Sequence, residues 1–136
     1  MADELELEIV TPFGSTYTGR VSGCILPGED GSFQVLNRHA ALISLIKIGA
    51  IRVTDSDQEE RYFATSGGYA EIKDNRIRVI VESAEPADAI DVKRAENARK
   101  RAENRIEQKE SGLDIERAEL ALARALNRIK LAQSGG

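Results

Sequence analysis

The chain has 136 residues and a net charge of −4, which suits one domain or two small ones and excludes a large multidomain enzyme. Hydrophobic residues make up 41% and charged residues 31%, as in globular proteins, and no apolar run approaches the roughly 18 residues of a membrane span. Cys24 and His39 are the only residues of their types, so a disulfide framework or a Cys/His zinc site within one chain is excluded. The acidic first eight residues do not resemble a leader, and we expect neither secretion nor direct membrane insertion.

The composition changes near Pro86. Residues 1–85 carry 8 basic and 14 acidic side chains, whereas residues 86–136 carry 11 and 9. All six aromatic residues lie in the first segment, and ten alanines lie in the second. We therefore expect two differently built domains, residues 1–85 and residues 86–136.

The first segment is predicted to form short β-strands. Apolar residues alternate with charged ones over residues 5–9 and 77–81, and six further strands are predicted over residues 21–26, 32–36, 42–46, 50–54, 61–65 and 69–72. Turn-forming residues separate these runs, and Gly67-Gly68 is interpreted as a turn or bulge. Eight strands in about 80 residues predict an antiparallel β-sandwich or flattened barrel.

The second segment has helical periodicity. Small and apolar residues recur at steps of three and four, at Ala95, Ala98, Ala102 and Ile106 and again at Ala118, Leu122, Ala125, Ile129 and Ala132. This predicts a helix of roughly 20 residues, a turn at Ser111-Gly112 and a second helix of about 18, paired as an antiparallel hairpin. The fold class is thus α+β by segment. Because each alanine methyl contributes only about 0.8 kcal/mol, we expect the hairpin to lean on the β domain or on another protein, and to exchange between them.

The residues favour no catalytic site. The chain has no GxxxxGK[ST] phosphate loop, no GxSxG elbow and no HExxH motif. Cys24 lies in a predicted strand, where a thiol is usually buried and inert, and His39 is interpreted as a structural loop residue. We expect no catalytic residue, no metal site and no required cofactor.

Four arginines of the hairpin are placed to converge. Arg94 and Arg101 lie two helical turns apart on one helix, and Arg124 and Arg128 lie one turn apart on the other. Folded back antiparallel, they could hold a polyphosphate without a glycine loop. Two alternatives stay open: a solvated face with pairs such as Glu96 and Lys100, or a basic surface that docks on an acidic partner. Nucleic acid is disfavoured, because the second segment is only +2 and its helices carry no aromatic residue.

Several motifs together resemble one family. They are IVTPFG at residues 9–14, G-x-x-G-S-F-Q-V-L-N-R-H-A-A-L at residues 28–42, SGGYAEI at 66–72, IRVIVESAE at 77–85 and RAELALARALNRI at 117–129. The order of a β-sandwich and an alanine-rich hairpin is also similar to that of the epsilon subunit of the F-type ATP synthase. The chain departs from the usual family pattern at residues 33–36 and 38–41, which affects loop shape.

The resemblance implies a non-catalytic rotor subunit that couples proton flow to ATP synthesis. It implies that the β-sandwich binds the gamma subunit and the ring of c subunits, and that the hairpin permits turnover when folded. Extended along gamma, the hairpin would meet the catalytic beta subunit and inhibit ATP hydrolysis. The implied location is peripheral, on the cytoplasmic side of a bacterial membrane, with the stromal side of the thylakoid as the alternative.

Some bacterial members of that family bind ATP as a regulatory ligand through an I/L-D-x-x-R-A motif, and residues 90–95 of this chain match it. The resemblance then implies an ATP site of Glu85, Ile90, Asp91, Arg94, Ala95, Arg101, Arg124 and Arg128. The arginines would hold the phosphates, Asp91 the adenine amino group, and Ile90 and Ala95 the base. Arg117 is a candidate for docking to beta, and His39 for a further partner contact. The alternative is a β-sandwich adaptor whose hairpin docks on a protein and binds no ligand.

Overall fold

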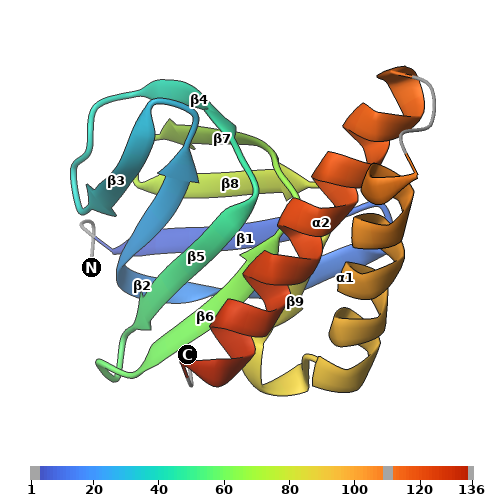
Figure 1. The fold of residues 1–136 in the computed structure, drawn as a ribbon. Helices are drawn as coiled ribbons and strands as arrows, with labels where there is room; N and C mark the ends of the chain where they lie inside the picture. The colour runs from blue at the N-terminus through green and yellow to red at the C-terminus, as the bar shows by residue number, and fades with distance from the viewer. Residues whose placement is uncertain (1–3, 109–111, 135–136) are drawn as a thin grey trace.

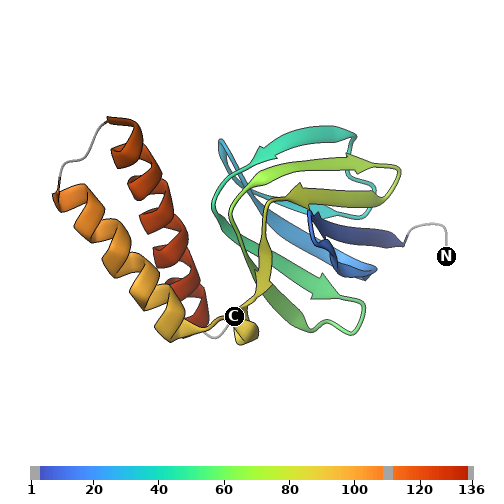
Figure 2. The same cartoon turned by 90° about the vertical axis from the view of Figure 1, so that its right-hand side faces the viewer.

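The computed structural model describes residues 4–108 and 112–134. Nine strands precede two helices: β1 Leu5–Thr11, β2 Gly14–Gly28, β3 Gly31–Leu36, β4 Leu42–Ile46, β5 Gly49–Asp55, β6 Glu60–Thr65, β7 Gly68–Lys73, β8 Arg76–Val81, β9 Ala84–Pro86, the 3₁₀ turn η1 Ala87–Ala89, α1 Val92–Glu107 and α2 Gly112–Gln133. The strands form a sandwich and the helices stand together on one side of it (Figure 1; Figure 2). The predicted β-sandwich followed by a helical hairpin is confirmed.

The strands follow one continuous order, β1-β8-β7-β4-β2-β5-β6-β9, with β3 and β1 also paired to β2. In the described part of the chain one pairing, β1 with β8, is parallel, which the expectation of an antiparallel sandwich did not include. β2 joins the two layers because its 15 residues pair with β1 in the first half and with β3 and β5 in the second. The sequence signal missed the first half of β2, where Ser15, Thr16 and Thr18 give no apolar alternation.

The core lies between the layers and follows from strand alternation. Leu5, Leu7 and Ile9 are at most 2% exposed, while Glu6 between them points to solvent. Cys24 lies in the same apolar cluster, as predicted for a buried thiol.

Gly67 and Gly68 carry the chain from β6 into β7. Gly67 has a φ of +108°, a conformation that suits glycine, and its N–H donates to Oγ1 of Thr65 at 3.2 Å. A Cβ on Gly68 would clash with the carbonyl oxygen of Ile80, so the backbone of β8 passes too close for a side chain. The predicted turn is therefore confirmed and has a packing reason.

The hairpin is held by small residues that let the helices approach closely. Ala95 and Ala102 of α1 and Ala118 and Ala125 of α2 are at most 2% exposed. Helix α1 begins after Asp91, whose carboxylate accepts a hydrogen bond from the backbone N–H of Arg94 at 3.1 Å.

The helices differ in length from the prediction. α1 has 16 residues and α2 has 22, because Gly112 opens α2 instead of forming the turn, while Ser111 lies outside the described residues. In residues 4–108 and 112–134, neither helix has the length and apolar character needed to cross a bilayer.

The buried Cys24 makes a pH-dependent contribution to stability. Burial raises the pKa of its thiol to about 12, above the value of about 8.5 in an unfolded chain. Since only the unfolded state ionises between these values, the contribution is fully present below pH 8.5 and is lost as the pH rises towards 12.

We therefore expect the free energy of unfolding of the wild type to lose about 2 kcal/mol from Cys24 between pH 8 and pH 10, and Cys24→Ala to lack this loss. Urea unfolding at the two pH values measures the difference, whatever the absolute cost of the substitution. Tyr17, whose pKa burial also raises, is present in both proteins and cancels. Equal pH dependence in the two proteins would contradict the assignment.

Candidate functional site

The hairpin docks on the sandwich through the end of α2. Leu131 is 6% exposed and packs in an apolar cluster with Ala64 of β6, Ala87 of η1 and Ile90. Figure 2 shows α2, in dark red, between the sandwich and α1. The expectation that the hairpin leans on the β domain is confirmed, and the contact that holds it is small.

Two polar contacts accompany this apolar cluster. Nδ2 of Asn127 donates to the carbonyl oxygen of Gly49 at 2.9 Å. Nε of Arg128 donates to Oε1 of Glu85 at 2.8 Å, and Nη2 donates to Oε2 at 3.3 Å. The side chains of Arg128 and Glu85 are 25% and 33% exposed, so this two-pronged pair binds more firmly than one in open solvent.

A cleft of about 740 Å³ lies between the sandwich and the hairpin, within the usual size range of a small-molecule site. Its sandwich wall includes the β1–β2 turn, the end of β6 and the segment from Glu82 to Pro86, and its helical wall includes Arg94, Ala98, Ala121, Arg124, Ala125, Asn127 and Arg128. Strand β9 brings Glu85 to the cleft by pairing with β6, Glu85 lying opposite Ala64.

The predicted convergence of arginines is seen for three of the four. Arg94, Arg124 and Arg128 line the cleft together with Glu85, whereas Arg101 lies further along α1 and does not line it. In the described part of the chain, no ion pair involves the side chain of Arg94 or Arg124. The cleft therefore holds two arginines without acidic partners and a third held by Glu85, an arrangement that favours an anion.

Three other predicted residues contribute to the structure around the cleft and do not line it. Ile90 is 9% exposed in the docking cluster, and Ala95 is fully buried between the helices. Asp91 caps α1. The predicted contacts of these residues with a base stay predictions.

The charged face of α1 partly fits the simpler interpretation of a solvated surface. Arg99 pairs with Glu96 at 2.7 Å and with Glu103 at 3.2 Å. Glu96 thus pairs with Arg99, one turn along α1, whereas the sequence suggested Lys100. Arg94 and Arg101, on the other hand, form no ion pair with Glu96 or Glu103.

The two partner-docking candidates lie far apart in the fold. Arg117 is exposed near the start of α2, and His39 lies in the loop between β3 and β4. Nδ1 of His39 is 2.7 Å from the carbonyl oxygen of Ala40, and its backbone N–H donates to Leu36 at 3.2 Å. These contacts fit a loop-forming role for His39 and leave docking as a prediction.

An exposed apolar face on the sandwich was not found from the sequence. Ile43 and Leu45 of β4 are 70% and 60% exposed, and Tyr69 of β7, which lies directly opposite Leu45, is 41% exposed. The available signal was the sequence LISLI, which is apolar at four of its five positions and does not alternate. Exposed apolar faces of this kind are candidates for contacts with other molecules.

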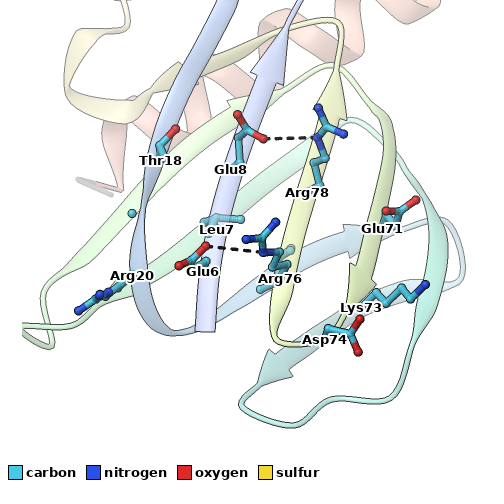
Figure 3. Close-up of a pocket in the computed structure, with 12 residues that line it drawn as sticks. Glu6, Leu7, Glu8, Thr18, Arg20, Glu71, Lys73, Asp74, Arg76 and Arg78 are labelled. Carbon is cyan, nitrogen blue, oxygen red and sulfur yellow. Dashed lines mark ion pairs between the residues drawn. The ribbon is translucent and has the colours of Figure 1, made fainter. Parts of the chain in front are cut away.

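A second concavity, of about 930 Å³, lies over β1, β2, β7 and β8 (Figure 3). Its charges neutralise one another across the parallel strands: Arg76 lies 3.8 Å from Glu6, and Arg78 lies 3.4 Å from Glu8. Because positive and negative side chains alternate on this exposed surface, the concavity suits an anionic ligand less well than the cleft does. In the residues that the structure describes, no group of three or more His, Cys, Asp or Glu side chains is placed to hold a metal ion.

A two-domain chain of this construction, with a β-sandwich and a docked helical hairpin, is matched by two family models. The beta-sandwich domain of the ATP synthase delta/epsilon chain matches residues 4–87, and the long alpha-helix domain of the same chain matches residues 88–133. The chain therefore belongs to the ATP synthase delta/epsilon family, which confirms the resemblance seen in the sequence.

The relatives named ATP synthase epsilon chain include the three that follow. That of Salinibacter ruber is 42% identical over 116 residues, covering 79% of this chain and 78% of the relative. That of Desulforamulus reducens is 43% identical over 115 residues, covering 83% and 85%. That of Pelotomaculum thermopropionicum is 44% identical over 110 residues, covering 80% and 81%.

The solved structures that share the fold include two mitochondrial ATP synthases. A chain of the Euglena gracilis mitochondrial ATP synthase OSCP/F1/c-ring structure gives a TM-score of 0.81 at 18% identity, covering 92% of this chain and 79% of that one. A chain of the Tetrahymena thermophila mitochondrial ATP synthase central stalk and c-ring gives 0.60 at 16% identity, covering 94% and 96%.

The docking contact predicts the effect of Asn127→Ala. Losing the hydrogen bond to Gly49 should weaken docking by about 1 kcal/mol, so that amides of α2 exchange about fivefold faster while those of the sandwich core do not change. Hydrogen exchange resolved along the chain measures this. Asn97→Ala, an exposed asparagine of α1, is the matched control. Equal exchange in the two variants would show that Asn127 does not hold the hairpin.

Proposed function

We propose that the chain is a non-catalytic central-stalk subunit of ATP synthase that couples proton flow to ATP synthesis and inhibits ATP hydrolysis through a mobile hairpin. ATP is the regulatory ligand of this proposal, and it stabilises the docked hairpin. The observation that carries it is the cleft itself: Arg94 and Arg124 from the two helices face the same space with no acidic partner, beside Arg128.

In this proposal the three arginines of the cleft bind the phosphates. Guanidinium groups match pairs of phosphate oxygens, and Arg94 and Arg124 are exposed and so accessible to a ligand from solvent. Arg128 is held by Glu85 when no anion is present. An anion bound at Arg128 therefore shares that guanidinium with Glu85 or displaces the carboxylate. Arg101, outside the cleft, is expected to contribute less than Arg94.

ATP acts on the hairpin through linkage. A ligand that binds only the docked hairpin stabilises it by about 1.4 kcal/mol at ten times its Kd. That is enough to shift a near-balanced equilibrium roughly tenfold. The small docking contact, in which Leu131 is the main α2 side chain, supports an equilibrium of this kind. Falling ATP would then release the hairpin to inhibit hydrolysis.

The partner subunits belong to the same proposal. The exposed face of Ile43, Leu45 and Tyr69 supports binding of the sandwich to gamma or to the c-ring. Arg117, exposed near the start of α2, is proposed to meet an acidic surface of the beta subunit when the hairpin extends. This places the chain on the periphery of the membrane through its partners, on the cytoplasmic side in a bacterium.

The ATP site is tested by Arg94→Ala combined with Arg124→Ala. Removing both unpaired guanidiniums is expected to weaken ATP binding at least about 100-fold, because each charge-assisted contact contributes roughly 1.5–3 kcal/mol. Isothermal titration of the full chain with ATP measures the affinity. ATP-dependent relief of hydrolysis inhibition in the reconstituted complex should be lost in parallel.

Arg105→Ala, which removes an exposed arginine of the last turn of α1, is the matched control and should bind ATP like the wild type. An unchanged affinity in the double variant would refute the site. If the wild type itself binds no ATP at several millimolar, the rotor role stands without the nucleotide, and the hairpin is a mechanical or docking arm.

A further inference from the structure

Phe13 stands out among the residues that line the cleft. Its side chain is 97% exposed, and it is the one aromatic residue on the cleft wall in the described part of the chain. It lies in the turn between β1 and β2, on the sandwich side, whereas the arginines lie on the helical side. An apolar ring and three cations therefore face one space from opposite walls.

The backbone around Phe13 is held in place although the ring is not buried. Oγ1 of Thr11 accepts a hydrogen bond from the N–H of Phe13 at 3.2 Å and donates one to the carbonyl oxygen of Gly14 at 3.3 Å. Pro12 fixes its own φ, and Gly14 takes a φ of +120° that side chains disfavour. The turn thus presents the ring to solvent from a constrained backbone.

The apolar residues that the sequence suggested for a nucleotide base are already in use. Ile90 packs in the docking cluster and Ala95 is enclosed between the helices, and neither lines the cleft. The cleft therefore offers a base little apolar surface from α1, while Phe13 offers a whole ring. Nucleobases stack on aromatic side chains, which typically strengthens binding about tenfold.

We propose that Phe13 is a further base-contacting residue of the cleft, stacking on the purine of a nucleoside triphosphate whose phosphates lie among Arg94, Arg124 and Arg128. This inference rests on the proposed nucleotide site. It assigns a residue that lets the site bind a nucleotide more tightly than a polyphosphate without a base. It predicts that the sandwich contributes to binding directly, so that a nucleotide joins the two domains.

The test compares ATP with inorganic tripolyphosphate on the full chain, by isothermal titration. Phe13→Ala is expected to weaken ATP binding about tenfold and to leave tripolyphosphate binding within twofold of the wild type. Phe13→Tyr, which keeps the ring, should restore ATP binding. Leu120→Ala, which removes an exposed apolar side chain of α2 that does not line the cleft, should leave both affinities unchanged.

Each other outcome has a definite meaning. If Phe13→Ala binds ATP like the wild type while Arg94→Ala with Arg124→Ala does not, the role of Phe13 is wrong and the nucleotide site stands. If Phe13→Ala weakens ATP and tripolyphosphate equally, Phe13 shapes the cleft and does not contact the base. If the wild type binds neither ligand, the proposed site fails, and this inference fails with it.

Discussion

The contact between the end of α2 and one edge of the sandwich decides what the rest of this molecule can do. The apolar cluster of Leu131, Ile90 and two alanines, one hydrogen bond from Asn127 and one ion pair from Arg128 hold the hairpin. Burying a leucine contributes roughly 1.5–3 kcal/mol, and the polar contacts add about 1 kcal/mol each. The sandwich core is far larger, so the docking contact is a small part of what stabilises the molecule.

The alanines buried between the two helices are consistent with this weak docking. Ala95, Ala102, Ala118 and Ala125 bring the helices close but bury few methyl groups, so the hairpin needs a surface to lean on. The cleft is enclosed only while that surface is the sandwich. A ligand that touches both walls would therefore stabilise the docked state, and an anionic ligand would compete with Glu85 for Arg128.

The sequence predicted much of the fold because the relevant signals are periodic. Alternation at Leu5, Leu7 and Ile9 identified an inward strand face, and the spacing of Ala95 and Ala102 identified the helical seam. The register between strands and the choice of neighbouring strand leave no periodic signal in the sequence. Neither the parallel pairing of β1 with β8 nor the short β9, which carries Glu85 to the cleft, could be inferred from the local pattern.

The candidate site was partly predictable for the same reason. Helical spacing places arginines on shared faces, and three of them do meet at the cleft. Spacing does not tell how far along the hairpin the sandwich reaches, which is why Arg101 lies outside the cleft. Phe13 lies in a turn and is not part of a repeating helix or strand pattern, so the sequence carries no signal for it. Its position on the cleft wall is visible only in the structure.

The central claim is that a nucleotide holds the hairpin against the sandwich. Hydrogen exchange of the isolated chain with and without millimolar ATP, resolved over residues 85–132, tests it most directly. The account predicts slower exchange in both helices and in the β1–β2 turn, with the sandwich core unchanged. Exchange that is the same with and without ATP would contradict the claim and leave the hairpin as a mechanical or docking arm.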